Sequence, residues 1–296
     1  MWPLITDEVR SPRRLTASPG GIAPAGPAAI RREGGPRVRG RTTMVALCLG
    51  GFSLYIRGEA VTPARWAVHN GGRNRVVGVM AYLVAHRHQR VTRERLIDIF
   101  WDQVDGDRAN QSLDRTVSAL RRALEPGLQK YRQSAYIVGP RDGYRFSSEV
   151  EIAVDAEEFI ARFKKAAEAE HRQGIAAAAP LYQQAETIYA GPFMDGVPYA
   201  ELWCHHQRQL LADYHRAALT RLAHSAWLSH DFDRVTSYAH RILGEYGCQG
   251  DVCRWLADAY IQQGAPAAAR RHVECCPFKQ RLSSAPCIDA PVVLER

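Results

Sequence analysis

A run of three helical patterns followed by a tight hairpin restricts the fold of this chain more than any other feature of its sequence. In each pattern, apolar residues recur every three or four positions, which is the spacing of one buried face of a helix. The third pattern ends before Pro126 and Gly127, a pair that stops a helix. The three predicted helices cover about residues 76–86, 92–101 and 108–124.

Short strand patterns lie on both sides of these helices. Brief apolar or alternating stretches bounded by glycine turns predict strands rather than helices. Residues 140–143 predict a tight turn between the last two strands. The order of strands, three helices and hairpin predicts a winged helix-turn-helix domain of α+β class over residues 44–150. The predicted strands cover residues 45–49, 52–56, 60–62, 136–138 and 144–146.

The segment before this domain lacks such patterning. Proline and glycine interrupt residues 18–27, and this stretch has no apolar period. Residues 1–43 are therefore expected to be disordered. The alternative is that translation starts at Met44, where the ordered patterning begins.

Charge divides the chain into a basic front and a mildly acidic back. The whole chain carries 39 Lys and Arg against 31 Asp and Glu, a formal net charge of +8. The net charge is +5 over residues 1–43, +6 over residues 44–150 and −3 over residues 151–296. This distribution predicts a polyanionic partner for the front part alone, with a merely solubilising excess of arginine as the alternative.

Residues 151–296 carry helical periodicity through most of their length. Ala226 and Trp227 align with Ala259 and Tyr260 at an offset of 33 residues, close to the tetratricopeptide period of about 34 residues. Because one helix pair cannot bury its own apolar face, such pairs must stack. This region is therefore predicted to be an all-α, tetratricopeptide-like repeat domain, and the chain as a whole to be mainly α.

The order of motifs resembles that of the SARP family of bacterial transcriptional activators. Members of this family join an OmpR-like winged helix to a bacterial transcriptional activator domain of tetratricopeptide type, and larger relatives add an ATPase. The chain has no Gly-x-x-x-x-Gly-Lys-Ser/Thr motif, so the resemblance implies a short form without the ATPase. The matching stretches are LIDIFW at residues 96–101, residues 110–124, GPRDGYR at 139–145, YAGPF at 189–193 and YAELW at 199–203.

The third predicted helix supplies the candidate DNA-reading face. Arginine and glutamine side chains there have the donors that bind base edges in the major groove, and an arginine at the hairpin tip suits a phosphate or a minor groove. The start of the second helix offers free backbone amides to a phosphate, although Thr92 is first expected to cap that helix. A plain solvated face is the alternative. The predicted DNA-binding residues are Gln111, Arg115, Ser118, Arg121 and Arg122, with Arg141 at the hairpin tip and Thr92 and Arg93 on the second helix.

Enzyme and metal-site motifs are absent from the sequence. There is no Gly-x-Ser-x-Gly, His-Glu-x-x-His or Gly-x-Gly-x-x-Gly. The group Cys248, Cys253, Cys275 and Cys276 lacks the Cys-x2-Cys spacing typical of zinc sites. We therefore expect no enzyme activity, no metal and no cofactor. Seven cysteines without a framework spacing, and no apolar run of about 20 residues, predict a reducing cytoplasmic location without membrane contact.

These features predict a sequence-specific DNA-binding regulator that activates a gene cluster. The front domain is expected to bind double-stranded DNA, and the back domain to mediate homodimerisation or contact with RNA polymerase. The alternative is a tetratricopeptide-type scaffold or adaptor whose winged helix binds protein rather than DNA. The salt dependence of DNA affinity separates the two, because neutralising phosphates gives a steep slope.

Overall fold

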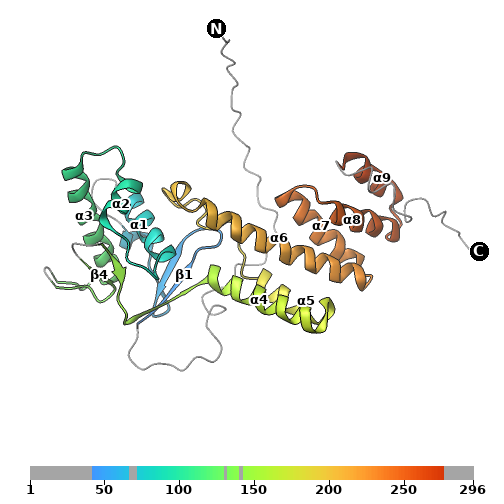
Figure 1. Ribbon diagram of the computed structural model, residues 1–296, viewed down its shortest axis with the longest axis horizontal. Helices are drawn as coiled ribbons and strands as arrows, with labels where there is room; N and C mark the ends of the chain where they lie inside the picture. Colours follow the sequence, from blue (N-terminus) through green and yellow to red (C-terminus); the bar gives the residue numbers. More distant parts are fainter. Residues whose placement is uncertain (1–41, 67–71, 130–131, 140–142, 277–296) are drawn as a thin grey trace, which may run out of the picture.

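The computed structural model describes residues 42–66, 72–129, 132–139 and 143–276. Within these ranges, a front region that combines a sheet with three helices precedes an all-helical back region (Figure 1). The protein is mostly helical, and the winged-helix region followed by a helical region confirms the predicted fold class. None of the helices in the described ranges combines the length and apolar character needed to cross a bilayer.

A four-stranded sheet forms one side of the front region, in the order β3-β2-β1-β6. β1 pairs antiparallel with β2 and parallel with β6, so the last strand of the region lies beside the first. Its strands are β1 (Thr42–Leu47), β2 (Ser53–Ile56), β3 (Glu59–Ala60) and β6 (Val150–Val154).

This sheet differs from the sequence-based expectation in its first and last strands along the chain. β1 begins at Thr42, so Thr42 and Thr43 belong to the sheet rather than to a disordered leader, and they pair with Val150 and Glu151. The rest of that expected leader lies outside the described residues. β6 was not predicted, because alternation over five residues is a weak signal until its partner strand is known.

The three helices of the front region are close to the predicted ones. α3 buries the stripe Leu113, Val117, Leu120 and Leu124, each at most 2% exposed. A 3-10 turn, η1 (Pro63–Trp66), precedes the helices, and a two-stranded hairpin follows them. The elements are α1 (Arg73–Ala85), α2 (Arg93–Phe100), α3 (Gly106–Leu124), β4 (Ile137–Val138) and β5 (Arg145–Phe146).

The back region is a row of helices in which each packs against the next, extending away from the front region (Figure 1). Stacked neighbours bury the apolar face that a single pair would leave exposed. The second helix of this row ends at Glu186 and contains Pro180. The elements are α4 (Asp155–Gln173), α5 (Ile175–Glu186), η3 (Ala200–Leu202), α6 (His205–Leu228), α7 (Phe232–Tyr246), α8 (Gly250–Gln262) and α9 (Pro266–Cys275).

One hydrophobic core spans the junction between the two regions. The Tyr82 ring of α1 meets Trp203 edge to face at 5.1 Å between ring centroids. α1 approaches the back region so closely that a Cβ at Gly78 would lie 2.8 Å from the carbonyl oxygen of Pro198. Only glycine permits this approach without a shift of the backbone. The front region is thus packed directly onto the back region.

Candidate nucleic-acid interface

The start of α2 is fixed by a side-chain cap. Thr92 has an extended backbone, and its Oγ1 accepts a hydrogen bond from the backbone N–H of Arg95 at 3.2 Å. This satisfies one of the N–H groups that a helix start leaves without a partner, and it confirms Thr92 as the predicted cap. The cap sets where α2 begins and therefore where the turn before it meets the hairpin.

The hairpin is anchored to that same turn. The backbone of Tyr144 donates to the carbonyl of Val91 at 2.7 Å and accepts from its N–H at 2.9 Å. Gly143 makes this possible, because its φ is +116° and a Cβ there would lie 2.2 Å from the Val91 carbonyl oxygen. The hairpin, here called the wing, is therefore held beside the start of α2.

Arg93 joins α2, α3 and the wing. Its guanidinium donates to the Asp114 carboxylate at 2.6 Å, to the Tyr144 hydroxyl at 2.6 Å and to the Asn110 side chain at 3.1 Å. The Arg93 side chain is only 15% exposed, and its hydrogen bond to Asp114 raises the pKa of the guanidinium. Arg93 thus stays charged while it positions the three elements. We call Arg93, Asn110, Asp114 and Tyr144 the junction network.

The junction network gives Arg93 a role that the sequence did not predict. Arg93 was predicted to contact DNA, and the structure instead places its guanidinium against protein groups. Asp114 and Tyr144 were missed as its partners because they follow Arg93 by 21 and 51 residues, a separation in which local patterns carry no signal. A phosphate contact from Arg93 stays a prediction.

Arg121 is also engaged within the protein. Its Nε donates to the carbonyl of Ile137 at 3.2 Å and its Nη2 to the carbonyl of Gly139 at 3.3 Å. Both carbonyls belong to the first side of the wing, so Arg121 ties the wing to α3. Its predicted contact with DNA remains untested. The predicted contact of Arg141 falls on a residue outside the described ranges.

The other four residues predicted on α3 form one exposed row. Gln111, Arg115, Ser118 and Arg122 are spaced by four, three and four, which places them on one face of the helix. Each precedes a buried residue of the apolar stripe by two positions or follows it by two, and a helix turns about 200° over two residues. The row therefore lies on the side of α3 away from the core. We call it the α3 row.

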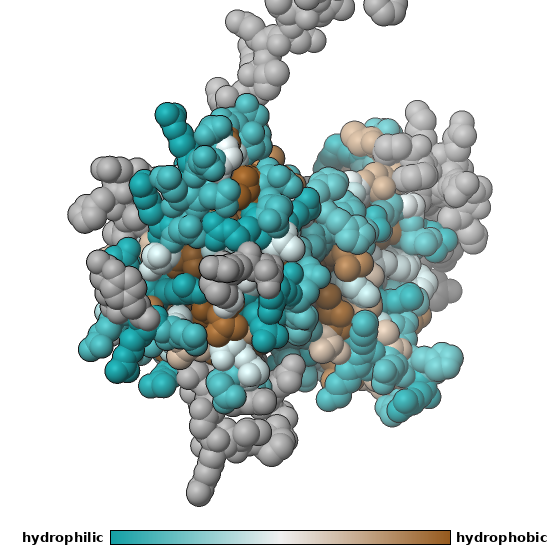
Figure 2. Space-filling view, turned by 60° about the vertical axis from the view of Figure 1, so that its left-hand side comes forward, coloured by the Kyte–Doolittle hydropathy of each residue, from teal (hydrophilic) through white to brown (hydrophobic). Residues whose placement is uncertain are grey.

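The arginines of the α3 row are available to a partner. Among the described residues, Arg115 and Arg122 make no hydrogen bond or ion pair. Ser118 donates to the backbone carbonyl of Asp114 at 2.8 Å, so its hydroxyl oxygen is left to accept. The side of the molecule around α3 is mainly hydrophilic (Figure 2).

Both regions match known protein families. Residues 73–146 match the family described as "Transcriptional regulatory protein, C terminal", and residues 154–282 match "Bacterial transcriptional activator domain". Both are families of transcriptional regulators, not of enzymes. No curated protein sequence matches the chain.

A solved structure has a similar fold. It is described as Mycobacterium tuberculosis EmbR in complex with low affinity phosphopeptide. It aligns with 85% of this chain and 62% of its own chain, with 20% sequence identity and a TM-score of 0.62. This chain therefore spans about 62% of the length of that relative, and at this identity the likeness shows the fold alone.

Proposed function

We propose that this chain reads a specific DNA sequence with the α3 row and activates a gene cluster in the cytoplasm. Its two matched domains give it the architecture of the SARP family of transcriptional activators. As a protein with these domains it is a DNA-binding transcriptional regulator. The finer claim depends on one observation above all. The α3 row presents two arginines and a glutamine on the outer face of a helix that the junction network and the wing hold in place.

The chemistry of the α3 row suits base edges. A helix fits the major groove of B-DNA, where arginine binds guanine O6 and N7 with two hydrogen bonds and glutamine does the same for adenine. Each such pair discriminates against a wrong base by about 1–3 kcal/mol. Gln111 and Arg115 are one helical turn apart, so both fit within a few base pairs.

The junction network supports this proposal because it fixes the positions of α2, α3 and the wing before DNA binds. Hydrogen bonds from Arg93 join the helix-turn-helix to the wing, and Arg121 joins α3 to the wing's other strand. Less conformational freedom is then lost when the surface binds. The backbone amides at the start of α2 remain suited to a phosphate, which would set the register of α3 in the groove.

The back region is proposed to contact proteins rather than DNA. Residues 151–296 have a net charge of −3 against +6 for residues 44–150, and phosphate repels a net negative surface. Stacked helices offer the concave and end surfaces on which repeat proteins bind partners. Contact with RNA polymerase, or with a second copy of the chain at paired sites, fits these properties.

The test is the salt dependence of duplex binding by the full chain. Affinity should fall steeply with salt, with a slope of about −0.9 per neutralised phosphate. Arg115→Ala should weaken binding, whereas Arg172→Ala, which removes an exposed arginine of α4, should leave it unchanged. A chain that binds no duplex at low salt, or that loses as much with Arg172→Ala, would support the scaffold alternative instead.

A further inference from the structure

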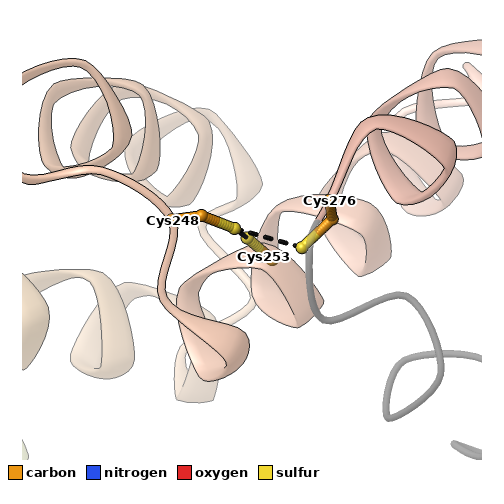
Figure 3. Close-up of side chains that lie close together, drawn as sticks. All are labelled: Cys248, Cys253 and Cys276. Atoms are coloured by element: carbon orange, nitrogen blue, oxygen red, sulfur yellow. Dashed lines mark hydrogen bonds between the residues drawn. The ribbon is translucent and has the colours of Figure 1, made fainter. Parts of the chain in front are cut away.

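Three cysteines from separate segments of the back region converge on one point (Figure 3). Cys248 lies in the loop after α7, Cys253 in α8, and Cys276 directly after α9. The Sγ of Cys248 is 2.8 Å from that of Cys253 and 3.1 Å from that of Cys276. All three sulfur atoms lie within 4.8 Å of one another.

These three thiols lie in largely apolar surroundings. Cys253 and Cys276 are buried and Cys248 is partly exposed, with Leu243 and Val273 packed beside them. The cluster is therefore apolar on the inside and reachable from solvent at Cys248. Burial raises the pKa of the Cys248 and Cys253 thiols.

Three sulfur donors in one place select a particular class of ligand. Thiolates are soft ligands that prefer zinc and copper(I), whereas magnesium and calcium require oxygen. A zinc ion with Zn–S distances of about 2.3 Å needs sulfur atoms about 3.8 Å apart. The sulfurs here would have to separate by roughly 1 Å, which a small rotation about χ1 supplies.

The separation along the chain explains why the sequence did not predict this arrangement. Cys248 and Cys253 are five residues apart, and Cys276 follows 28 residues after Cys248. Only the return of α9 along α8 brings the third thiol back to the first two. The absence of a Cys-x2-Cys pair was therefore no guide to what the fold assembles.

We propose that Cys248, Cys253 and Cys276 form a thiolate site for a thiophilic d10 cation, zinc(II) or copper(I). Binding converts the three thiols to thiolates and releases their three protons to solvent, so no bond between sulfurs forms and nothing is oxidised. With three protein ligands, a fourth coordination position of zinc stays open to water or to an external thiol.

The proposed site would fasten the end of the helical row. Ala269 is the only residue of α9 that is buried, and α9 packs mainly against α8. A helix with so little buried surface depends on other restraints to stay docked. A cation held by the α7–α8 loop, α8 and the end of α9 provides that restraint. The docking of α9 on α8 would then depend on whether the metal is bound.

The experiment is a metal titration of the full chain. Protein freed of metal by a chelator and reduced with a phosphine is titrated with zinc(II), and separately with copper(I), against a chromophoric competitor. One ion per chain is expected in at least one arm. Cys248→Ala should weaken that binding by about 10²-fold or more, because each chelating ligand acts at high effective concentration. Cys275→Ser is the matched control, since Cys275 is exposed and lies beside Cys276.

A second readout avoids dependence on any variant. Bound metal should protect Cys248, Cys253 and Cys276 of the unaltered chain from alkylation, mapped by mass spectrometry, while Cys275 keeps reacting. Cobalt(II) in place of zinc should give thiolate-to-metal charge-transfer absorption. The proposal is overturned if neither ion binds the reduced chain, if protection falls equally on Cys275, or if Cys275→Ser loses as much affinity as Cys248→Ala.

Discussion

At the scale of single residues, four arginines near α3 have different roles. Arg93 holds Asp114 and Tyr144, and Arg121 holds two carbonyls of the wing. Arg115 and Arg122 project from the outer face of α3, where they make no bond within the described ranges. The first pair holds α2, α3 and the wing together, and the second pair belongs to the surface proposed to read DNA. Residue type alone does not reveal this division.

Asp114→Ala should lower the free energy of unfolding by about 1–3 kcal/mol, because Arg93 then keeps a largely buried charge without its carboxylate. Thermal or denaturant unfolding measures the change. Asp98→Ala, which removes another exposed carboxylate from the same region, should change stability by less than about 0.5 kcal/mol. Equal losses in the two variants would contradict the role of the junction network.

Arg121→Ala should weaken binding to every duplex by a similar factor. The reason is that the carbonyls of Ile137 and Gly139 lose their donor and the wing becomes less fixed, while no base contact is removed. The measurement compares affinities for specific and random duplexes. A change in preference at one base pair, with affinity for random DNA unaltered, would show that Arg121 reads bases instead.

At the scale of elements, the start of α4 is linked to the turn after β1 by one buried carboxylate. Asp155 accepts from the backbone N–H groups of Cys48 at 2.7 Å, Leu49 at 3.0 Å and Ala156 at 2.8 Å. Burial raises its pKa to about 6, and these hydrogen bonds limit the rise. This contact lies where the front region meets the back region.

The sign of the resulting pH dependence follows from that pKa. The folded chain binds more protons at Asp155 than the unfolded chain does between about pH 4 and pH 6, so stability falls as pH rises through this window and then levels off. The decrease in the free energy of unfolding that is due to Asp155 is roughly 2–3 kcal/mol. Asp155→Asn should remove it, as denaturant unfolding of both proteins at pH 4.5 and 7 would measure. An unchanged pH dependence in the variant would contradict this.

Most elements of the fold could be predicted from the sequence, whereas the contacts between them could not. The stripe from Leu113 to Leu124 and the turn before Tyr144 are local patterns, and both predicted their elements. β6 and the three-cysteine cluster form only because segments far apart in the sequence meet. The local spacing of residues does not show which distant segments will meet. The α3 row was predicted because it follows from helical spacing, but the inward roles of Arg93 and Arg121 depend on where the wing docks.

At the scale of the whole molecule, the front region is packed against the back region rather than joined to it by a flexible linker. β6 runs directly into α4, and one core includes Met44 and Phe100 from the front with Phe159 and Leu211 from the back. A structural change in the back region can therefore reach α1 through packed side chains such as Tyr82 and Trp203.

A chain cut after Glu151 should be much less stable than the front region of the full chain. The cut removes most of β6. It also uncovers the faces of α1 and α2 that pack on Trp203 and Tyr199, and exposed apolar surface favours association. Thermal unfolding and sedimentation of the fragment would measure this. A monomeric fragment that melts with the full chain would show that the shared core contributes little.

The central claim, that the α3 row reads bases, is tested most directly by selecting bound sequences from a random duplex pool with the full chain and with Arg115→Ala. The account predicts that the unaltered chain enriches a defined motif. Arg115→Ala should lose preference at one base pair of that motif and about 1–3 kcal/mol of specific affinity. An identical motif of identical strength from both proteins would contradict the account.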